Sequence, residues 1–505
     1  MRVRAAVLVL LLGAAAPAAP SGAPAPAVSK RSAALVSALS AAPAGRPQVA
    51  WVFFADKGAA ARAASGTVMV PLTARALSRR ALRGRFAGAT VEDLPLEASY
   101  VERVTATVAR VRQRSRWLNA VSVEATPAQL EALEKMPFVA RLDLVRRYRL
   151  GDPERAQKDV TASAAVRAPS APTSALDLDY GKSIGQLSQI NVPAVHAMGF
   201  HGEGVVVAVL DAGFSNLNHE VFSSLHILAT HDFVNGDDDV ADGADQGEGS
   251  HGTMTLSVLG GFKEGQLIGP AYAAGFILAK TENTASETPV EEDNWAAAAE
   301  WAEALGADVI STSLGYLDYD SPFTSYSFAD MNGETAISTR AANLAASLGV
   351  VVVASAGNSG FDAAHNTLGA PADGRGVIAA GAVDARGTRA FFSSVGPTAD
   401  GRIKPDVDAQ GVSVKVASPT SPSLYGLADG TSFSCPLTAG VAALVVQAHP
   451  EYTPQQVADA LRSTASQAGR PDNLLGYGIV NAAAAVGSRA SASQPGQWVP
   501  WDRHP

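Results

Sequence analysis

The chain carries two different hydrophobic patterns, and the change between them lies near residue 180. In the C-terminal part, short uninterrupted apolar runs recur, and stretches with helical periodicity lie between them. Continuous apolar runs predict strands that are buried on both faces, because a strand with one face in water alternates apolar and polar residues. The runs that we interpret as strands are residues 205–210, 276–279, 308–311, 350–354 and 377–380, and the predicted helices include residues 295–305 and 339–348.

Strands that alternate with helices along a chain are typical of a parallel sheet covered by helices on both faces. Residues 179–486 are enough for one such domain of about 300 residues. We therefore predict an α/β domain of three layers, αβα, with a mainly parallel sheet in the middle. In open sheets of this type, functional side chains gather at the carboxyl ends of the strands.

Residues 28–150 show a different pattern, with a few short apolar segments between basic stretches. Thr126 followed by Pro127 is typical of a helix start. The order of strand, helix, strand, helix and strand predicts a small α+β domain. The expected strands are residues 51–54, 118–124 and 138–144, and the expected helices are residues 76–82, 101–115 and 126–135.

The remaining segments are expected to lie outside the two domains. Residues 1–27 have the three parts of an export signal, with Arg2 and Arg4, an apolar run at residues 5–13, and small residues around candidate cleavage sites at Ala18 and Ala27. The apolar run is too short to span a bilayer, so we predict a secreted product, extracellular or periplasmic, without a membrane anchor. The alternative is a buried first helix. Residues 151–178, rich in Ala, Ser, Thr and Pro, are a predicted linker, and residues 487–505 a polar tail.

Composition narrows the class of protein further. The chain has 505 residues, of which 47% are hydrophobic and 17% charged, which favours a large folded core over disorder. The net charge of -9 gives no basic footprint, so no nucleic-acid partner is expected. Cys435 is the single cysteine, which excludes an internal disulfide; we interpret it as a packed thiol. A monomer is expected.

Two polar residues follow the pattern of catalytic groups. Asp211 comes directly after the apolar run 205–210, and it would lie at the carboxyl end of a strand. His251 lies in Ser250-His251-Gly252-Thr253, before an apolar helical stretch, and is expected in the first turn of that helix. Taken alone, Asp211 could serve as a helix cap and His251 as a polar surface residue.

A serine and an asparagine complete this set. Ser432 lies in Gly430-Thr431-Ser432, before a long apolar helix, where free N–H groups favour developing negative charge. We expect Pro436 to be tolerated in the first turn of that helix. A serine hydroxyl needs a histidine base, which in turn needs an orienting carboxylate; by residue type Ser434 is a rival nucleophile. Asn358 follows the run 350–354 and could donate to an oxyanion, or simply form a turn.

These motifs, in this order, resemble the subtilases, the subtilisin-like serine proteases. The resemblance covers most of residues 180–485 and has the family's order of Asp, His and Ser. The blocks that carry it are Val207-Ala208-Val209-Leu210-Asp211, Ser250-His251-Gly252-Thr253, Val309-Ile310-Ser311-Thr312-Ser313-Leu314-Gly315, Ala356-Gly357-Asn358, Phe392-Ser393-Ser394-Val395-Gly396-Pro397, Lys404-Pro405-Asp406-Val407 and Gly430-Thr431-Ser432.

The resemblance implies a subtilisin-like fold and a serine endopeptidase that hydrolyses peptide bonds through an acyl-enzyme. It assigns Ser432 as nucleophile, His251 as general base and acid, Asp211 as the residue that orients His251, and Asn358 as oxyanion donor. Four further residues would line the substrate cleft: Ser313, Leu314, Gly315 and Gly357. Protein or peptide substrates are implied. The alternatives are a catalytically silent subtilase-like binding module and a narrow processing protease.

The N-terminal domain resembles the subtilase propeptide more loosely, most clearly over residues 118–148. The resemblance implies a zymogen whose propeptide assists folding and then inhibits the enzyme until it is removed. An unrelated accessory domain is the alternative. The basic stretches of this domain contrast with the acidic C-terminal half of the chain, so we expect charge attraction to help docking.

Some residues depart from the family's pattern: Ala212, Glu220 and Gln410 replace the usual residues without removing a catalytic group. No cofactor is expected for the chemistry and no metal site is assigned. The resemblance allows structural calcium at a site that the sequence does not place. Calcium needs six to eight oxygen ligands in one cage. The acidic residues 237–248 do not have the spacing of a helix-loop-helix calcium loop, and we interpret them as a solvated loop.

Overall fold

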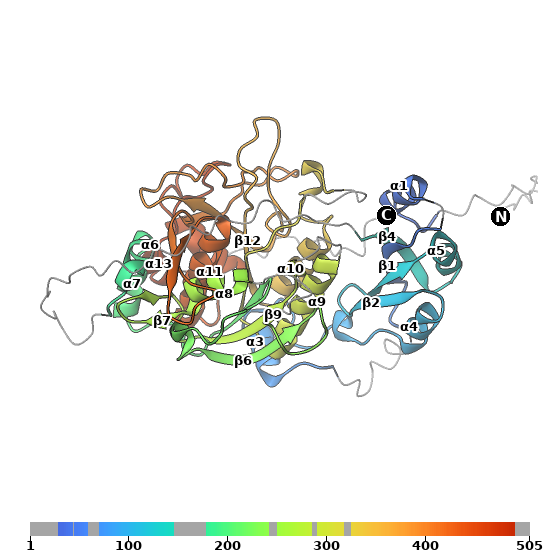
Figure 1. The fold of residues 1–505 in the computed structure, drawn as a ribbon, viewed down its shortest axis with the longest axis horizontal. Coiled ribbons are helices and arrows are strands. Elements are labelled where there is room, and N and C mark those ends of the chain that lie inside the picture. Colours follow the sequence, from blue (N-terminus) through green and yellow to red (C-terminus); the bar gives the residue numbers. More distant parts are fainter. Residues whose placement is uncertain are drawn as a thin grey trace, which may run out of the picture.

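The computed structural model describes residues 29–43, 45–58, 70–145, 178–241, 250–284, 290–317 and 325–489. Two regions, each with its own large sheet, lie side by side (Figure 1). The predicted export signal at 1–27, residues 151–177 of the predicted linker and the tail beyond residue 489 lie outside the described residues.

The C-terminal region is built around one sheet of seven strands, and all six pairs of neighbouring strands in it are parallel. The strand order is β13-β12-β11-β10-β5-β9-β6, so the strand that ends at Asp211 lies inside the sheet. The strands are β5 (Val206–Asp211), β6 (His226–Asp232), β9 (Gly275–Lys280), β10 (Val309–Thr312), β11 (Val351–Ser355), β12 (Val377–Val383) and β13 (Val407–Gln410). Two antiparallel hairpins flank it: β7 (Phe262–Lys263) with β8 (Leu267–Ile268), and β14 (Val414–Ala417) with β15 (Tyr425–Ala428).

The five predicted runs are confirmed as β5, β9, β10, β11 and β12, but the outer strands β6 and β13 were not predicted. β6 is an edge strand whose residues are largely exposed, and its apolar run is limited to the three residues Ile227, Leu228 and Ala229. β13 is fully buried, yet it contains Asp408 and Gln410, which interrupt its apolar pattern.

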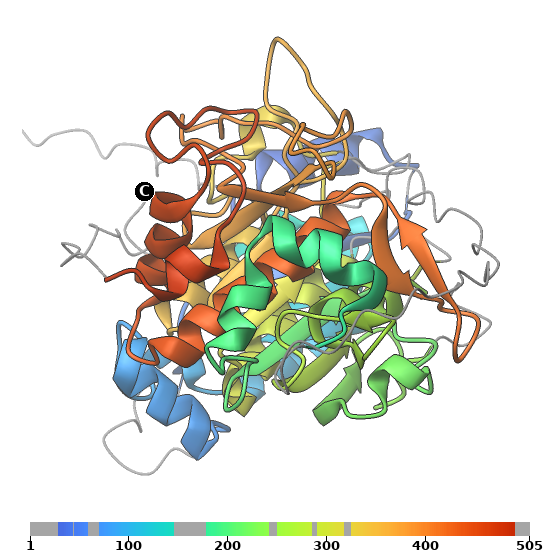
Figure 2. The same cartoon turned by 90° about the vertical axis from the view of Figure 1, so that its left-hand side faces the viewer.

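Helices cover both faces of the sheet, which confirms the three-layer α/β prediction. On one face, Val207 and Val209 pack in the same core as α8 (Ser250–Gly260) and α11 (Thr431–Ala448). On the other, the alternate residues Val206, Ala208 and Leu210 pack with α9 (Val290–Leu305) and α10 (Ile337–Ser347). Further helices lie on the α8/α11 side (Figure 2): α6 (Ile184–Gln189), α7 (Val192–Ala197), α12 (Pro454–Thr464) and α13 (Ala482–Val486).

The N-terminal region contains a four-stranded antiparallel sheet of order β2-β3-β1-β4, which confirms the α+β prediction. Thr126 caps α5 together with Gln129, and Pro127 occupies its first turn as expected. The strands are β1 (Gln48–Phe54), β2 (Arg110–Ser115), β3 (Ala120–Ala125) and β4 (Val139–Leu144), and the helices are α1 (Ala33–Ala41), α3 (Ala74–Arg83), α4 (Ala98–Thr105) and α5 (Pro127–Glu134).

The prediction of one helix at residues 101–115 is wrong. The helix α4 ends at Thr105, and residues 110–115 form the strand β2, which pairs with β3. The sequence of β2 alternates arginines with Val111, Gln113 and Ser115, a period of two that suits a strand with one solvated face. Pairing with β3 therefore overrides the helical preference of the arginines.

β1 joins the two regions through the alternation of its side chains. Val49, Trp51 and Phe53 belong to the core that contains α9 and α10, whereas Ala50 and Val52 face the core of the N-terminal region itself. Every residue of this strand is buried. The N-terminal sheet thus lies directly on the outer helices of the seven-stranded sheet.

The long apolar helix α11 lies in the middle of the C-terminal region. Among the described residues, α11 is the one helix whose length and composition would allow it to cross a membrane, and 89% of that stretch is buried inside the protein. The expectation that Pro436 falls in its first turn is wrong. The helix begins at Thr431, so Pro436 is its sixth residue and lies in the second turn.

Candidate active site

The carboxylate of Asp211 lies at the carboxyl end of β5, fully buried, and three groups donate to it. His251 Nδ1 lies 2.6 Å from Oδ1, the amide of Ala212 donates to the same oxygen at 2.7 Å, and Thr255 Oγ1 donates to Oδ2 at 2.8 Å. His251 is in the first turn of α8, as predicted, and Thr255 follows it one turn later on the same helix face. The carboxylate and the imidazole therefore hold each other in one orientation.

Gly252 allows the close approach of α8 to the segment after Asp211. A Cβ atom at this position would lie 2.3 Å from the carbonyl oxygen of Gly213. Any side chain at residue 252 would push the helix away from β5, and the contact between His251 and Asp211 depends on that approach.

Ser432 lies in the first turn of α11 and exchanges two hydrogen bonds with Ser313, which follows β10. Ser432 Oγ donates to the Ser313 carbonyl oxygen at 3.1 Å, and Ser313 Oγ donates to the Ser432 carbonyl oxygen at 2.8 Å. In a regular helix the amide of residue 436 would bond the carbonyl of residue 432, but Pro436 has no N–H. Proline in the second turn thus leaves an acceptor that the Ser313 hydroxyl satisfies.

The start of α8 and the start of α11 meet at this point. The ring of Phe433, next to Ser432 in the chain, lies 6.2 Å from the ring of His251, centroid to centroid. The side chain of His251 is 15% exposed, whereas Ser432 is 4% exposed. The structure therefore brings Asp211, His251 and Ser432 together at the carboxyl ends of β5 and β10, although they are 40 and 181 residues apart in the sequence.

Asn358 lies beside the same helix terminus, after β11. Its Oδ1 accepts from the Thr431 amide at 2.9 Å and from Thr431 Oγ1 at 2.8 Å, which fixes the orientation of its side-chain amide. Gly357 adopts a φ of +111°, and a Cβ there would lie 2.8 Å from Ser394 Oγ. Glycine is therefore required to bring Asn358 to the helix terminus.

The predicted cleft residues Ser313, Leu314 and Gly315 lie opposite a second chain segment. Tyr316 and Ala370 exchange backbone hydrogen bonds of 2.9 and 3.0 Å, and a Cβ on Gly315 would lie 4.0 Å from the Cα of Gly369. Gly357 lies near Gly369 as well, so the glycines allow these three backbone segments to pack closely.

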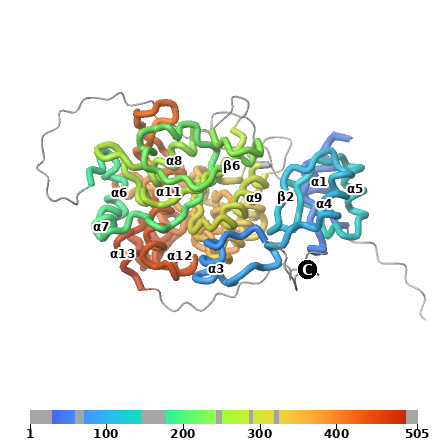
Figure 3. The backbone as a smooth tube through the Cα atoms, turned by 90° about the horizontal axis from the view of Figure 1, so that it is seen from below, coloured from blue at the N-terminus to red at the C-terminus, as the bar shows by residue number. Residues whose placement is uncertain are grey.

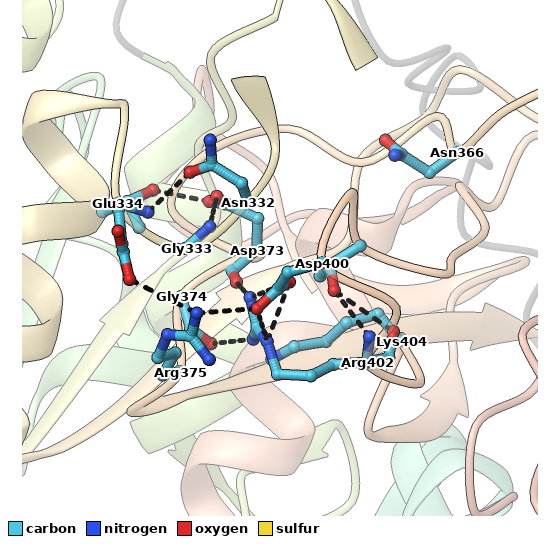
Figure 4. A network of polar contacts seen from close by, with 12 residues as sticks. Asn332, Gly333, Glu334, Asn366, Asp373, Gly374, Arg375, Asp400, Arg402 and Lys404 are labelled. Carbon is cyan, nitrogen blue, oxygen red and sulfur yellow. Dashed lines mark hydrogen bonds and ion pairs between the residues drawn. The ribbon is translucent and has the colours of Figure 1, made fainter. Parts of the chain in front are cut away.

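A network of polar contacts fixes the segment that follows Gly369 (Figure 4). Arg402 donates to the carbonyl oxygens of Asp373 and Gly374 at 2.6 and 3.2 Å, and it also pairs with Asp400. Arg375 pairs with Asp400 Oδ2 at 2.8 Å, an oxygen to which Arg402 Nε also donates. The buried Asp373 carboxylate accepts from Thr339 Oγ1 at 2.5 Å, and its burial raises its pKa.

Ser434, the rival nucleophile by residue type, and the neighbouring Cys435 both have side chains that are bonded within the core. Ser434 Oγ donates to the Thr431 carbonyl oxygen at 2.9 Å and is fully buried. Cys435 Sγ lies 3.3 Å from the Thr312 carbonyl oxygen, and burial raises the pKa of its thiol to about 12. A thiol that stays protonated and buried is a packing residue rather than a nucleophile.

Within the described ranges, no group of three or more His, Cys, Asp or Glu side chains is arranged to hold a metal ion. The acidic stretch predicted as a solvated loop is described only up to Ala241, and there Asp237 and Asp239 accept from the amides two residues further along. Residues 242–249 of that stretch lie outside the description.

Two residues of the site were missed by sequence reasoning. Thr255 bonds Asp211 and could have been found from its position four residues after His251, on the same face of α8. Thr431 orients Asn358, and the signal for it is weaker, because a threonine before the serine could equally have been a helix cap.

Comparison with known proteins agrees with this arrangement. Residues 202–478 match the model of the subtilase family, and residues 49–161 match that of the peptidase S8 propeptide domain, Bacteroidota. Subtilisin E of Bacillus subtilis (strain 168) is 33% identical over 312 residues, which is 61% of this chain and 72% of that protein. M-protease of Shouchella clausii (strain KSM-K16) is 33% identical over 366 residues, 72% of this chain and 79% of that protein.

Among solved structures, fervidolysin from Fervidobacterium pennivorans, described as a keratinolytic enzyme related to subtilisin, superposes with a TM-score of 0.60 at 21% identity. The match covers 89% of this chain and 62% of fervidolysin, and it shows a shared fold. The subtilase match covers more than half of the chain, and the propeptide match lies on the N-terminal sheet. The chain therefore belongs to the subtilase family, as a subtilisin-like serine protease preceded by its propeptide domain.

Proposed function

We propose that this protease is a secreted endopeptidase in which Asp211, His251 and Ser432 form the catalytic triad, and that it is made as a zymogen. The observation that carries the proposal is the 2.6 Å contact between His251 Nδ1 and the buried Asp211, beside the helix terminus that holds Ser432. A buried carboxylate on Nδ1 selects the tautomer that carries its proton there and leaves Nε2 as the basic nitrogen.

The proposed reaction begins with a rotation of the Ser432 side chain. In the structure its hydroxyl donates to the Ser313 carbonyl oxygen, and a turn about the Cα–Cβ bond would direct it towards the imidazole of His251. His251 Nε2 would take the hydroxyl proton as Oγ attacks the scissile carbonyl, and would then give that proton to the leaving amine. A water molecule would hydrolyse the acyl-enzyme by the same route, with His251 again as base.

Negative charge on the substrate oxygen would be stabilised by the Ser432 amide and the Asn358 side-chain amide. The Ser432 amide lies in the first turn of α11, where helix N–H groups lack intrahelical acceptors. The two bonds from Thr431 to Asn358 Oδ1 turn the NH₂ group of Asn358 away from Thr431. Donors that are held in place before the reaction stabilise such charge without reorganisation.

The proposed substrates are extended polypeptides. Ser313, Leu314 and Gly315 on one side and Gly357 on the other offer backbone edges along which an extended chain can add as a strand. Glycines 315, 357 and 369 allow these backbone edges to lie close together, since a Cβ on any of them would meet a neighbouring atom within 4.0 Å. Broad specificity for the substrate side chain is part of the proposal. Neither a cofactor nor a metal is part of the proposed chemistry; structural calcium stays a prediction, which a melting temperature unchanged by EDTA would contradict.

The intact mass of the exported chain tests the proposal, with wild type beside Ser432→Ala. Wild type should lose the signal and a piece that ends between residues 150 and 180, whereas the variant should lose the signal alone. A fluorophosphonate probe should label processed wild type and not Ser432→Ala. If wild type stays whole and unlabelled, the silent binding module becomes the better interpretation; if both are trimmed alike, processing is done by another protease.

A further inference from the structure

One helix of the propeptide domain lies apart from the rest of that domain. α3 packs against α9, beneath the protease domain, whereas the four-stranded sheet with α1, α4 and α5 lies at its side (Figures 1 and 3). We call residues 72–94 the arm; it contains α3 and the short turn Val91–Asp93 and connects β1 to α4. The arm is therefore a second place at which the propeptide contacts the protease domain.

Arginines on α3 bind the end of α9. Arg79 pairs with the Glu303 carboxylate and also donates to the carbonyl oxygens of Glu303 and Ala307, the latter at 2.6 Å. Arg80 pairs with Glu303 Oε2 at 2.7 Å, and with Asp93 inside the arm at 2.6 Å. The side chains of Arg79, Arg80 and Glu303 are at most 2% exposed, so these ion pairs are shielded from water.

A second carboxylate, Asp308, receives the other arginines of the helix. Arg75 and Arg83 each pair with one of its oxygens, and the amide of Val206 donates to it at 2.8 Å. Backbone hydrogen bonds frame the contact: the Thr73 amide donates to the Ala304 carbonyl oxygen at 2.9 Å, and the Arg85 amide to that of Ser347 at 2.8 Å. The arm thus contacts α9, the end of α10, and Asp308, the residue directly before β10.

The charges on the two sides match. The protease domain offers Glu303 and Asp308, and the arm covers them with four arginines, three of which are buried. Burial lowers the pKa of Arg79 to about 10, while its pairing with Glu303 opposes that shift. Buried charges of this kind are tolerated only when they are paired. Loss of one partner leaves the other charge buried and unpaired, which carries a high free-energy cost.

The arm docks far from the reacting residues. Asp308 bonds the first residue of β5, Val206, and Asp211 is the last residue of the same strand. Five residue steps of about 3.3 Å place the two ends roughly 17 Å apart. The arm therefore binds at the amino ends of the strands, opposite the active site, and cannot obstruct the cleft.

We propose that the arm anchors the propeptide at a site remote from the active site. It recognises the Glu303 and Asp308 carboxylates and keeps the propeptide bound after the linker has been cut. The sheet of the propeptide provides the first contact, on α9 and α10, and the arm provides the second. The inhibitory role of the propeptide rests on the proposed function, but the anchor itself does not need catalysis.

The test uses the full chain with Ser432→Ala and a recognition site for a foreign protease inserted in the 151–178 linker. After that protease has cut the linker, the dissociation rate of the propeptide is measured by surface capture of the protease domain. The double variant Arg79→Gln with Arg83→Gln removes only contacts between the arm and the protease domain. The ion pair of Arg80 with Asp93, inside the arm, is unchanged. The matched control is Arg46→Gln, which removes the charge of an exposed arginine on the propeptide.

We expect the double variant to dissociate at least about 100-fold faster than the parent complex, and the control within about twofold of it. Glu303→Gln, on the other side, should also speed dissociation, and its combination with Arg79→Gln should cost less than the sum of the two, because they share one contact. Unchanged dissociation in the double variant, or strictly additive effects of Arg79 and Glu303, would overturn the anchor. Since the nick comes from a foreign protease, failure of the proposed catalysis cannot produce either result.

Discussion

Ser313 and Ser432 exchange hydrogen bonds in both directions, hydroxyl to carbonyl, and so connect the wall of the cleft to the proposed nucleophile. The bond from Ser313 Oγ at 2.8 Å satisfies a carbonyl that the helix itself cannot satisfy, because Pro436 has no N–H to offer. The position of Ser432 therefore depends on a residue 119 positions earlier and on a proline one turn later.

Ser313→Ala should destabilise the protease domain by about 1–3 kcal/mol, since it leaves the buried Ser432 carbonyl oxygen without a donor. The melting temperature of the Ser432→Ala chain, with and without the change, measures this cost. Adding Pro436→Ala restores an amide that can bond that carbonyl, so the double change should recover part of the loss. A Ser313→Ala cost that is the same with proline or alanine at position 436 would contradict the role assigned to Pro436.

Thr255→Val should lower kcat by roughly tenfold while changing KM little. The hydroxyl of Thr255 donates to Asp211 Oδ2 and holds the carboxylate that orients His251, and Thr255 itself is buried. Loss of one hydrogen bond to a charged group costs about 1.5–3 kcal/mol, part of which would appear in the barrier. Steady-state kinetics of the processed enzyme on a peptide substrate measure the effect.

The conservative variant separates positioning from packing at this residue. Thr255→Ser keeps the hydroxyl and should restore most of the activity, whereas Thr255→Val keeps the shape and should not. If both variants have the same kcat, the hydroxyl has no role in orienting Asp211 and the effect is one of packing.

Much of the protease domain could be predicted because its signals are local. Four of the five predicted strands contain apolar runs of four or more residues, and Asp211 and His251 lie where a strand ends and a helix begins. The edge strand β6 gave a weaker signal, since its apolar run is only three residues long and most of its residues are exposed. The residues that orient the site, Thr255 and Thr431, act through tertiary contacts that residue type alone does not reveal.

The propeptide was harder to predict because its elements are defined by what they bind. The arginines of β2 were assigned to a helix, although their alternation with Val111, Gln113 and Ser115 has the period of a strand, which pairing with β3 stabilises. α3 is a well-formed helix in both sequence and structure, but nothing local indicates that its arginines would pair with Glu303 and Asp308, more than 200 residues later.

The affinity of the propeptide for the protease domain should fall as pH rises. Asp293, on α9, is buried under the propeptide, where Ser122 donates to it, and burial raises its pKa to about 8 despite the opposing Arg112 on β2. Glu292, beside it on α9, raises the pKa further. Without the propeptide the carboxyl should titrate near its ordinary value of about 4. Binding then takes up a proton between these pKa values, so affinity should fall by up to tenfold per pH unit from about pH 4 to pH 8 and level off above.

Dissociation of the nicked Ser432→Ala complex, measured from pH 5 to pH 9, checks this dependence. Asp293→Asn stays neutral at every pH and should flatten the profile while keeping the contact with Ser122. Arg79→Gln, in the arm, should raise the rate at all pH values without changing the slope. A profile that Asp293→Asn leaves as steep as before would assign the pH dependence to another group.

A buried acid in β13 should make the protease domain less stable at high pH. Asp408 is fully buried, both its carboxylate oxygens lack hydrogen-bond partners among the described residues, and burial together with Asp472 holds its pKa well above the ordinary value. The unfolded chain releases this proton near pH 4, and the folded chain does so only at much higher pH. Stability is therefore present at low pH and lost as pH rises through that interval.

Asp408→Asn should remove this loss and raise the melting temperature of the Ser432→Ala chain at pH 9, by an amount equivalent to about 1–3 kcal/mol, with little change at pH 4. Asp406, two residues earlier, is the matched control, because it is equally buried but pairs with Lys404 at 2.7 Å and with Arg462 at 2.5 Å. Those cations lower the pKa of Asp406, so the stability that its carboxylate contributes is present at neutral pH and lost in acid. Asp406→Asn should therefore destabilise the chain at pH 7 by about 3–5 kcal/mol, the cost of a broken buried pair. Melting curves at the three pH values distinguish the two carboxyls; an Asp408→Asn shift that is the same at pH 4 and pH 9 would show that Asp408 is not the titrating group.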